Sequence, residues 1–220
     1  LTYITQDRPL GLAHALKTAL PFVGGDDCLM YLGDNLVKDG VRDVVADFAA
    51  HRPNCQILLC PVDNPSSFGV ADLGPDGRII RLVEKPAVPP SNLALVGVYL
   101  FDNTIGEAID AIRPSARGEL EITDAIQYLV EHEYDVYPYV HEGWWIDTGK
   151  MEDMLEANRM VLDEMDHSIK GHVDTESRVN GKVTIEEGAE IIRSIIRGPA
   201  IIGEHARIIN SYVGPFTSIY

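Results

Sequence analysis

The triplet Gly33-Asp34-Asn35 places polar side chains directly after an apolar run, residues 28–32. That run is typical of a strand buried on both faces, and open α/β sheets bind ligands just beyond the carboxyl ends of their strands. A carboxylate at this position could hold a hard cation against a phosphate, because carboxylate oxygens are the ligands that Mg²⁺ prefers. The alternative is that Asp34 caps the helix that follows.

The elements around Asp34 alternate between strands and helices. Strands are predicted at residues 1–5, 28–32 and 56–60, and helices at residues 11–20 and 41–51. This alternation is typical of a parallel α/β sheet. Such a sheet would place Asp34 at the edge where ligands bind.

The pattern changes after the third strand. Residues 68–73 and 79–84 flank Gly74-Pro75-Asp76-Gly77, a turn typical of a β-hairpin. Further along the chain, strands are predicted at residues 94–101, 135–140 and 144–146, and helices near residues 105–112, 122–129 and 150–165.

The residues after position 166 repeat an apolar side chain at every sixth position. The repeat comprises Val179, Ile185 and Ile191, then Ile196, Ile202 and Ile208, then Val213 and Ile219, each set 17 residues after the last. This spacing is the mark of a parallel β-helix with three short strands per coil and the apolar residues pointing inward. The sequence stops at Tyr220 in mid-coil, and repeat proteins normally finish with a capping unit, so we expect an incomplete β-helix.

The composition excludes several classes of function. The chain has 220 residues, and 18 Lys and Arg against 34 Asp and Glu give a formal net charge of −16. Such a surface repels nucleic acid and anionic lipid. No apolar run is long enough to span a membrane, and the N-terminus does not resemble a signal peptide. Cys28, Cys55 and Cys60 fit reduced core residues, so we expect a cytoplasmic protein. From the charge and the short apolar runs we expect that it binds neither nucleic acid nor membrane.

Five motifs, taken in order, carry a resemblance to a known family. They are Leu32-Gly33-Asp34-Asn35, Phe68-Gly69-Val70, Val83-Glu84-Lys85-Pro86, the run from Ser115 to Asp124, and Trp145-Ile146-Asp147-Thr148-Gly149. Together they resemble the sugar-1-phosphate nucleotidylyltransferases, most of all the long-form glucose-1-phosphate thymidylyltransferases. The resemblance implies an α/β, Rossmann-like nucleotide-diphosphosugar transferase domain over residues 1–166. It also implies a left-handed β-helix of hexapeptide repeats over residues 167–220, and a homo-oligomer.

The resemblance implies a reaction and a metal ion. The family converts dTTP and glucose 1-phosphate to dTDP-glucose and pyrophosphate, for deoxysugar nucleotide biosynthesis. Such a transfer needs positioning and charge neutralisation more than covalent chemistry. By resemblance Asp34 and Asp147 hold Mg²⁺, and Asp34, Lys85 and Asp147 form the catalytic set. The residues alone leave open that Asp147 caps the helix near Lys150.

The resemblance also assigns residues that bind the two substrates. Arg suits a phosphate through its fork of donors and Lys as a point charge, although surface cations are more often simply solvated. The implied set is Lys85 and Arg117 for the sugar phosphate, Asn35, Glu84 and the backbone at Gly69 and Leu95 for the sugar hydroxyls, and Gln6 and the backbone near Gly11 for the base.

One family motif is missing from the sequence. The family carries a Gly-rich loop near its N-terminus, followed by an Arg and later a Lys, which cradle the triphosphate. Gly24-Gly25-Asp26-Asp27 lacks these cations, and no other such loop occurs. We therefore expect the transferase domain to be N-terminally incomplete. We also expect these 220 residues alone to have little or no transferase activity.

Three other functions stay open. A uridylyltransferase would use the same residues, because uracil and thymine offer Gln6 the same imide edge. A nucleotidylyltransferase acting on another hexose phosphate also stays open. A non-catalytic regulatory subunit would bind the sugar nucleotide without releasing pyrophosphate. A β-helix also occurs in acyltransferases, for which His172 and His205 are the candidate residues, but neither lies in a recognisable acyltransfer motif.

Overall fold

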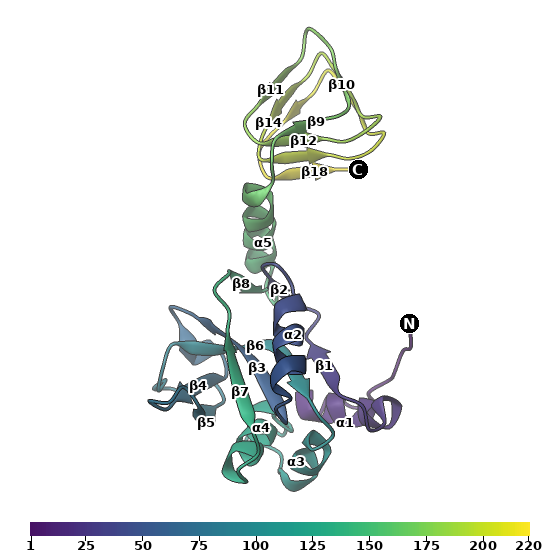
Figure 1. Ribbon diagram of the computed structural model, residues 1–220. Helices are drawn as coiled ribbons and strands as arrows, with labels where there is room; N and C mark the ends of the chain where they lie inside the picture. Colours follow the sequence, from purple (N-terminus) through teal and green to yellow (C-terminus); the bar gives the residue numbers. More distant parts are fainter. The chain divides into compact units, whose positions relative to one another are not determined.

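The computed structural model describes residues 1–220 and divides into two compact units, Leu1–Ile146 and Asp147–Tyr220 (Figure 1). The first unit is built on a mixed six-stranded sheet in the order β5-β4-β6-β3-β7, with β1 also paired to β6. Its strands are β1 (Cys28–Tyr31), β3 (Cys55–Pro61), β4 (Val70–Leu73), β5 (Ile79–Val83), β6 (Leu93–Phe101) and β7 (Val136–Val140). A separate two-stranded sheet joins β2 (Asn35–Val37), which was not predicted, to β8 (Trp145–Asp147).

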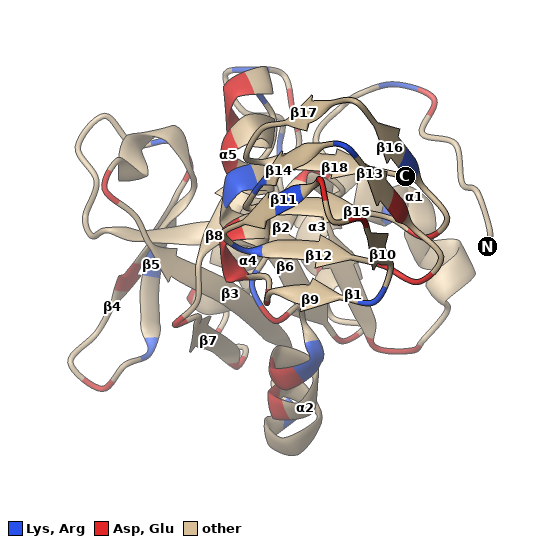
Figure 2. Ribbon diagram, turned by 90° about the horizontal axis from the view of Figure 1, so that it is seen from above, with Lys and Arg blue, Asp and Glu red and all other residues tan.

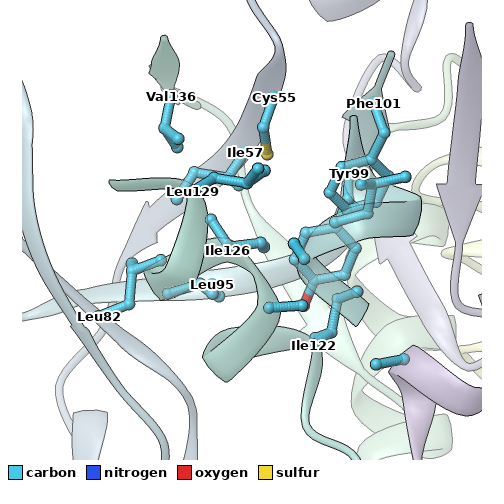
Figure 3. Close-up of a cluster of buried hydrophobic side chains, with 14 of the residues drawn as sticks. Cys55, Ile57, Leu82, Leu95, Tyr99, Phe101, Ile122, Ile126, Leu129 and Val136 are labelled. Atoms are coloured by element: carbon cyan, nitrogen blue, oxygen red, sulfur yellow. The ribbon is translucent and has the colours of Figure 1, made fainter. Parts of the chain in front are cut away.

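Helices cover the large sheet through two groups of buried side chains. One group joins α1 (Leu12–Val23), α3 (Ile105–Ala111) and α4 (Ile122–Glu131) to Ile57 and Leu59 of β3 (Figure 3). The other joins α2 (Arg42–His51) to Leu58 and Cys60 of the same strand. Successive residues of a strand point to opposite faces, so β3 contributes to both cores and is buried from Cys55 to Cys60.

The prediction of a parallel sheet is wrong for most strand pairs. β1, β3 and β4 all run antiparallel to β6, and only β3 and β7 pair in parallel. β1 and β3 do run in the same direction, as the alternation of strand and helix requires, but β6 lies between them. Alternation along the chain does not reveal that a later strand is inserted between two earlier ones.

Two details of the predicted strands are also wrong. β1 is not buried on both faces, because Leu29 is 38% and Tyr31 is 39% exposed. This strand pairs with β6 alone and so has one unpaired edge. Residues 1–5 form no strand, and Leu1, Tyr3 and Ile4 are exposed. β-branched residues favour a strand only where a neighbouring strand accepts their backbone hydrogen bonds.

The second unit begins with α5 (Met151–Glu164) and continues as a parallel β-solenoid. Three sheets form its sides, in the orders β10-β13-β16, β11-β14-β17 and β18-β15-β12-β9. The strands are β9 (Ser168–Ile169), β10 (His172–Val173), β11 (Arg178–Asn180), β12 (Val183–Ile185), β13 (Glu190–Ile192), β14 (Ile195–Arg197), β15 (Ala200–Ile202), β16 (Arg207–Ile209), β17 (Tyr212–Val213) and β18 (Thr217–Ile219).

The predicted repeat is confirmed in the register of these strands. Val179 pairs with Ile196, which pairs with Val213, and Ile191 pairs with Ile208. Six of the eight predicted positions are buried in the inner cluster, and Val179 and Ile219 are partly buried against it. The solenoid, which is consistent with a left-handed β-helix, starts earlier than the repeat, because β9 pairs with β12 and β10 with β13. The predicted fold class, an α/β transferase domain followed by a parallel β-helix, is confirmed.

Acidic side chains prevail on the surface of the second unit. The helix α5 carries Glu152, Asp153, Glu156, Asp163 and Glu164 against the single cation Arg159 (Figure 2).

None of the helices combines the length and the apolar character that crossing a bilayer requires. Cys28, Cys55 and Cys60 are all free thiols.

Candidate active site

Asn35 is the centre of a hydrogen-bond network at the carboxyl end of β1. The side chain of this residue is buried, and its Oδ1 accepts a hydrogen bond from Trp145 Nε1 over 2.5 Å. Its Nδ2 donates to Asp34 Oδ1 over 2.8 Å. Because the amide is used at both ends, its orientation is fixed, and it fixes the carboxylate of Asp34 in turn. The neighbouring Tyr31 hydroxyl donates to the carbonyl of Asn35 over 2.8 Å.

Gly97 allows β6 to approach this network, and it lies outside the predicted site residues. A Cβ atom at Gly97 would lie 2.6 Å from Leu32 Cδ1 and 2.8 Å from Asn35 Nδ2. The amide of Gly97 also donates toward Asn35 Oδ1 over 3.4 Å. A glycine in the middle of an apolar strand is the signal that would have found it, since it marks a close approach of another group.

Neither aspartate of the predicted metal pair caps a helix. The N-cap of α2 is Val41 and that of α5 is Lys150, so Asp34 and Asp147 stand outside both cap positions. Asp147 Oδ1 instead accepts a hydrogen bond from the amide of Gly149 over 2.9 Å. Asp147 is the first residue of the second unit, so its proximity to Asp34 stays a prediction.

A second group of predicted residues gathers where β4, β5 and β6 meet the first turn of α4. The amide of Leu95 donates to the carbonyl of Gly69 over 2.8 Å. A Cβ atom at Gly69 would lie 3.2 Å from Glu84 Oε2 and 3.3 Å from Thr123 Oγ1. Thr123 Oγ1 donates to Glu84 Oε2 over 2.7 Å. The structure thus brings Gly69, Glu84 and Leu95 together and adds Thr123, which lies in the motif from Ser115 to Asp124 but is not among the predicted site residues.

The two predicted phosphate-binding cations differ in their surroundings. Lys85 is exposed, forms no ion pair, and has a left-handed backbone with a φ of 41°. Such a φ is uncommon outside glycine and often marks functional positions. Arg117 is paired with three carboxylates, those of Glu84, Glu119 and Glu121, at 3.4, 3.6 and 2.8 Å. Phosphate binding by Arg117 stays a prediction, and it would take place beside these carboxylates.

The carboxylates around Arg117 shift the ionisation of their neighbours. The hydrogen bond to Glu121 raises the pKa of Arg117, because it favours the charged guanidinium. Burial raises the pKa of Asp124, and the charges of Glu121 and Glu84 add to the effect. Burial also raises the pKa of Tyr99, with a contribution from Glu84, so this phenol stays neutral. The electrostatic potential around Arg117 is therefore dominated by the negative charges of the carboxylates paired with it.

The predicted base-binding residues lie together near the start of α1. Gln6 Nε2 donates to the carbonyl of Gly11 over 3.3 Å and lies 2.8 Å from His14 Nδ1. Gly11 has a φ of 103°, and a Cβ there would lie 2.4 Å from the carbonyl oxygen of Leu120. Only glycine fits this position. The contact with Leu120 links the segment to the motif that carries Arg117.

The donor set at Asp34 fits a magnesium ion bound partly by substrate. No group of three or more His, Cys, Asp or Glu side chains is arranged to hold a metal ion by itself. Mg²⁺ usually retains water and binds through one or two carboxylates together with substrate phosphates. The carboxylate of Asp34, held in orientation by Asn35, is suited to that kind of site.

Comparison with known proteins decides the family. The profile of the nucleotidyl transferase family matches residues 1–164. The chain belongs to the nucleotidyl transferase family. Members of this kind generally use a divalent metal ion, which agrees with the donor set at Asp34.

Similar proteins carry more specific names. The chain is 53% identical over 220 residues to a glucose-1-phosphate thymidylyltransferase of Streptomyces antibioticus, and 52% identical over 219 residues to that of Streptomyces griseus. Each comparison covers the whole chain, which spans 62% of the length of these relatives. A Bacillus anthracis structure, assigned as a glucose-1-phosphate thymidylyltransferase and solved with sucrose, is 36% identical, with a TM-score of 0.67 over 76% of this chain and 67% of that one.

Proposed function

We propose that the protein carrying this sequence is a glucose-1-phosphate thymidylyltransferase. It transfers a thymidylyl group from dTTP to glucose 1-phosphate and releases dTDP-glucose and pyrophosphate. The observation that carries the proposal is the identity of 53% and 52% to two enzymes of that name over the whole chain. The grouping of Gly69, Glu84 and Leu95 supports it, because the family resemblance assigns all three to the sugar and they lie side by side.

The sugar phosphate would bind along β4, β5 and α4. Glu84 accepts hydrogen bonds from sugar hydroxyls through the oxygen that Thr123 leaves available, and the backbone at Gly69 and Leu95 lines the same surface. The exposed ammonium of Lys85 binds the phosphate as a point charge. Asn35 contributes to sugar binding while it orients Asp34.

The reaction needs an in-line approach of two anionic groups. An oxygen of the sugar phosphate attacks the α-phosphorus of dTTP, and the bond from that phosphorus to the pyrophosphate oxygen breaks. Mg²⁺, held by Asp34 and Asp147, would neutralise charge on the phosphates when bound. Lys85 holds the attacking phosphate in place, and Gln6 and the backbone at Gly11 hold the base, so that the chain's own contribution is positioning.

We extend the proposal to the organisation of the protein. The transferase domain ends near residue 166, and the β-helix after it serves contacts in a homo-oligomer. The protein works in the cytoplasm, where the three free thiols stay reduced. The isolated 220 residues should release little pyrophosphate, because they contain no Gly-rich loop of the kind that cradles the triphosphate.

The test compares nucleotides and sugars with the whole protein that carries this sequence. Glucose 1-phosphate and MgCl₂ are supplied with dTTP or UTP, and both pyrophosphate and the sugar nucleotide are measured. Efficient formation of dTDP-glucose supports the proposal. Preference for UTP or for another hexose phosphate replaces the substrate named here. Binding of dTDP-glucose without any release of pyrophosphate indicates a regulatory subunit instead.

A further inference from the structure

Glu121 is the only acidic residue among the buried residues of the chain. It is 5% exposed and stands at the N-cap of α4, but its side chain makes no capping bond to that helix. A buried carboxylate is costly unless it is paired and hydrogen-bonded. The buried carboxylate of Glu121 must therefore be stabilised by hydrogen bonds to groups outside the backbone of α4.

The partner of Glu121 is the guanidinium of Arg117. Glu121 Oε1 accepts from Arg117 Nε over 3.2 Å and from Nη2 over 2.9 Å, while Oε2 accepts from Nη2 over 2.8 Å. The hydroxyl of Ser115 donates to the same Oε1 over 2.7 Å. A contact through several hydrogen bonds orients a guanidinium more strictly than a single ion pair does.

This contact leaves one end of the guanidinium available. Arg117 Nη1 donates to no protein group, and the side chain is 45% exposed. Nη2 also lies 3.4 Å from Glu84 Oε1, which places the guanidinium beside the residue assigned to the sugar. Glu121 thus binds Nε and Nη2 and leaves the two N–H donors of Nη1 for an anion next to Glu84.

The loop that carries Arg117 is closed on itself in a way that supports the same arrangement. The amide of Ser115 donates to the carbonyl of Glu119 over 2.8 Å, and the amide of Gly118 donates to the carbonyl of Ser115 over 2.8 Å. These two hydrogen bonds fix the backbone of the loop from Ser115 to Glu119. The long Arg117 side chain still needs a partner to fix its rotamers, which an exposed arginine otherwise samples at considerable entropy.

We propose that Glu121 is a positioning residue that directs the Nη1 end of Arg117 toward the phosphate of the sugar substrate. The inference rests on the proposed function. Glu121 touches no substrate itself and acts through Arg117. Its contribution is to place the guanidinium beside Glu84, so that one phosphate and one sugar ring are recognised together.

The test measures the KM of each substrate for Glu121→Gln in the whole protein that carries this sequence. The substitution keeps the size of the side chain but replaces one acceptor oxygen by an NH₂ group, which cannot accept from Nη2. We expect the KM of glucose 1-phosphate to rise at least about fivefold and that of dTTP to change less than about twofold. Arg117→Lys should show the same split, and the double variant should be no worse than the more severe single one.

The matched control is Glu119→Gln, which removes a carboxylate from the same loop. Glu119 lies 3.6 Å from Arg117 Nη2 and its side chain is 41% exposed, so both KM values should stay near those of the parent. If Glu121→Gln does not fold, Glu121→Asp keeps the charge and retracts it by one methylene, and it should show the same split.

Three results would overturn the inference while the proposed function still stands. Unchanged KM values for a folded Glu121 variant would leave the residue only a structural role, as would a fall in thermal stability with both KM values altered equally. An effect of Glu119→Gln as large as that of Glu121→Gln would assign the change to charge alone. If the parent protein does not convert dTTP and glucose 1-phosphate, the proposed function fails first and the inference fails with it.

Discussion

Thr123 Oγ1 donates a hydrogen bond to Glu84 Oε2 over 2.7 Å, and so joins the first turn of α4 to the end of the β4–β5 hairpin. Thr123 is buried, so this donor is not replaced by water when it is removed. The bond holds one oxygen of Glu84 and turns the other toward Arg117.

Replacing Thr123 by Val should weaken recognition of the sugar. Val has nearly the same shape but no donor, so Glu84 loses its orientation. We expect the KM of glucose 1-phosphate to rise about fivefold to tenfold, which corresponds to the roughly 1 kcal/mol net value of a typical intramolecular hydrogen bond. The KM of dTTP should not change. Thr123→Ser keeps the hydroxyl and should behave as the parent; equal effects of Val and Ser would contradict this role.

Replacing Trp145 by Phe should weaken the binding of the metal ion. The change removes the donor to Asn35 Oδ1, so the amide that orients Asp34 can rotate. We expect a loss of about 1–2 kcal/mol in the free energy of unfolding, and a several-fold rise in the MgCl₂ concentration that gives half-maximal activity. The control is Tyr31→Phe, which removes a hydroxyl that donates to the backbone carbonyl of Asn35. The side-chain amide of Asn35 stays in place, so the magnesium dependence should follow that of the parent. A magnesium dependence that is the same for Trp145→Phe and the parent would rule out the linkage.

Replacing Ile202 by Ala should destabilise the β-helix. Ile202 is fully buried in the middle strand pair of its sheet, and removing such a side chain costs about 2–5 kcal/mol. Hydrogen exchange of peptides from β12, β15 and β18 should become faster. Ile195→Ala changes the same residue type at a position 40% exposed, so its cost should stay below about 1 kcal/mol. Similar exchange in the two variants would refute the inward orientation of the repeat.

The carboxylate of Asp174 should make the β-helix sensitive to acid. It accepts hydrogen bonds from Ser177 Oγ over 2.6 Å and from the amide of Arg193, one coil away, over 3.0 Å. The bond from Ser177 and the backbone amides lower the pKa of Asp174. Its stabilising effect is therefore complete above the pKa of the unfolded chain, about 3.9, and is lost as the pH falls through the lower folded value.

The measurement for Asp174 is hydrogen exchange of the Arg193 and Ser194 amides between about pH 5 and about pH 3. After correction for the intrinsic rate, protection should fall with acid in the parent. Asp174→Asn should start lower and depend less on pH. Glu176→Gln removes a neighbouring carboxylate and should follow the parent. A parent whose protection is constant across this range would disprove the effect.

The sequence predicted the β-helix almost residue by residue and the large sheet less well. The inward positions of the solenoid recur at a fixed interval, so Val179, Ile196 and Val213 had to stack once the coil length was known. The position of β6 between β1 and β3 depends on contacts between distant segments, which a periodic pattern does not contain. Residues 1–5 had the composition of a strand but no neighbour to pair with.

Site residues could be predicted where a family motif assigns a role to one residue. They could not be predicted where one cation is paired with several carboxylates. Gly69, Glu84 and Leu95 were assigned from the resemblance, and the structure brings them together. Arg117 was assigned to a phosphate, but its pairing with Glu121 was overlooked, although the two residues have the (i, i+4) spacing of an ion pair. Burial decides which of the neighbouring carboxylates matters, and burial cannot be read from a loop sequence.

The stacking of Val179 on Ile196 and of Ile196 on Val213 makes each coil of the β-helix interchangeable with its neighbours. A whole coil can be inserted or deleted without changing which side chain meets which, because contacts in a solenoid run only between adjacent repeats. A change of a few residues would instead shift every following inward position to a corner or to the outside. Related proteins should therefore differ in the length of this region by entire coils, and recombination between them should succeed at coil boundaries.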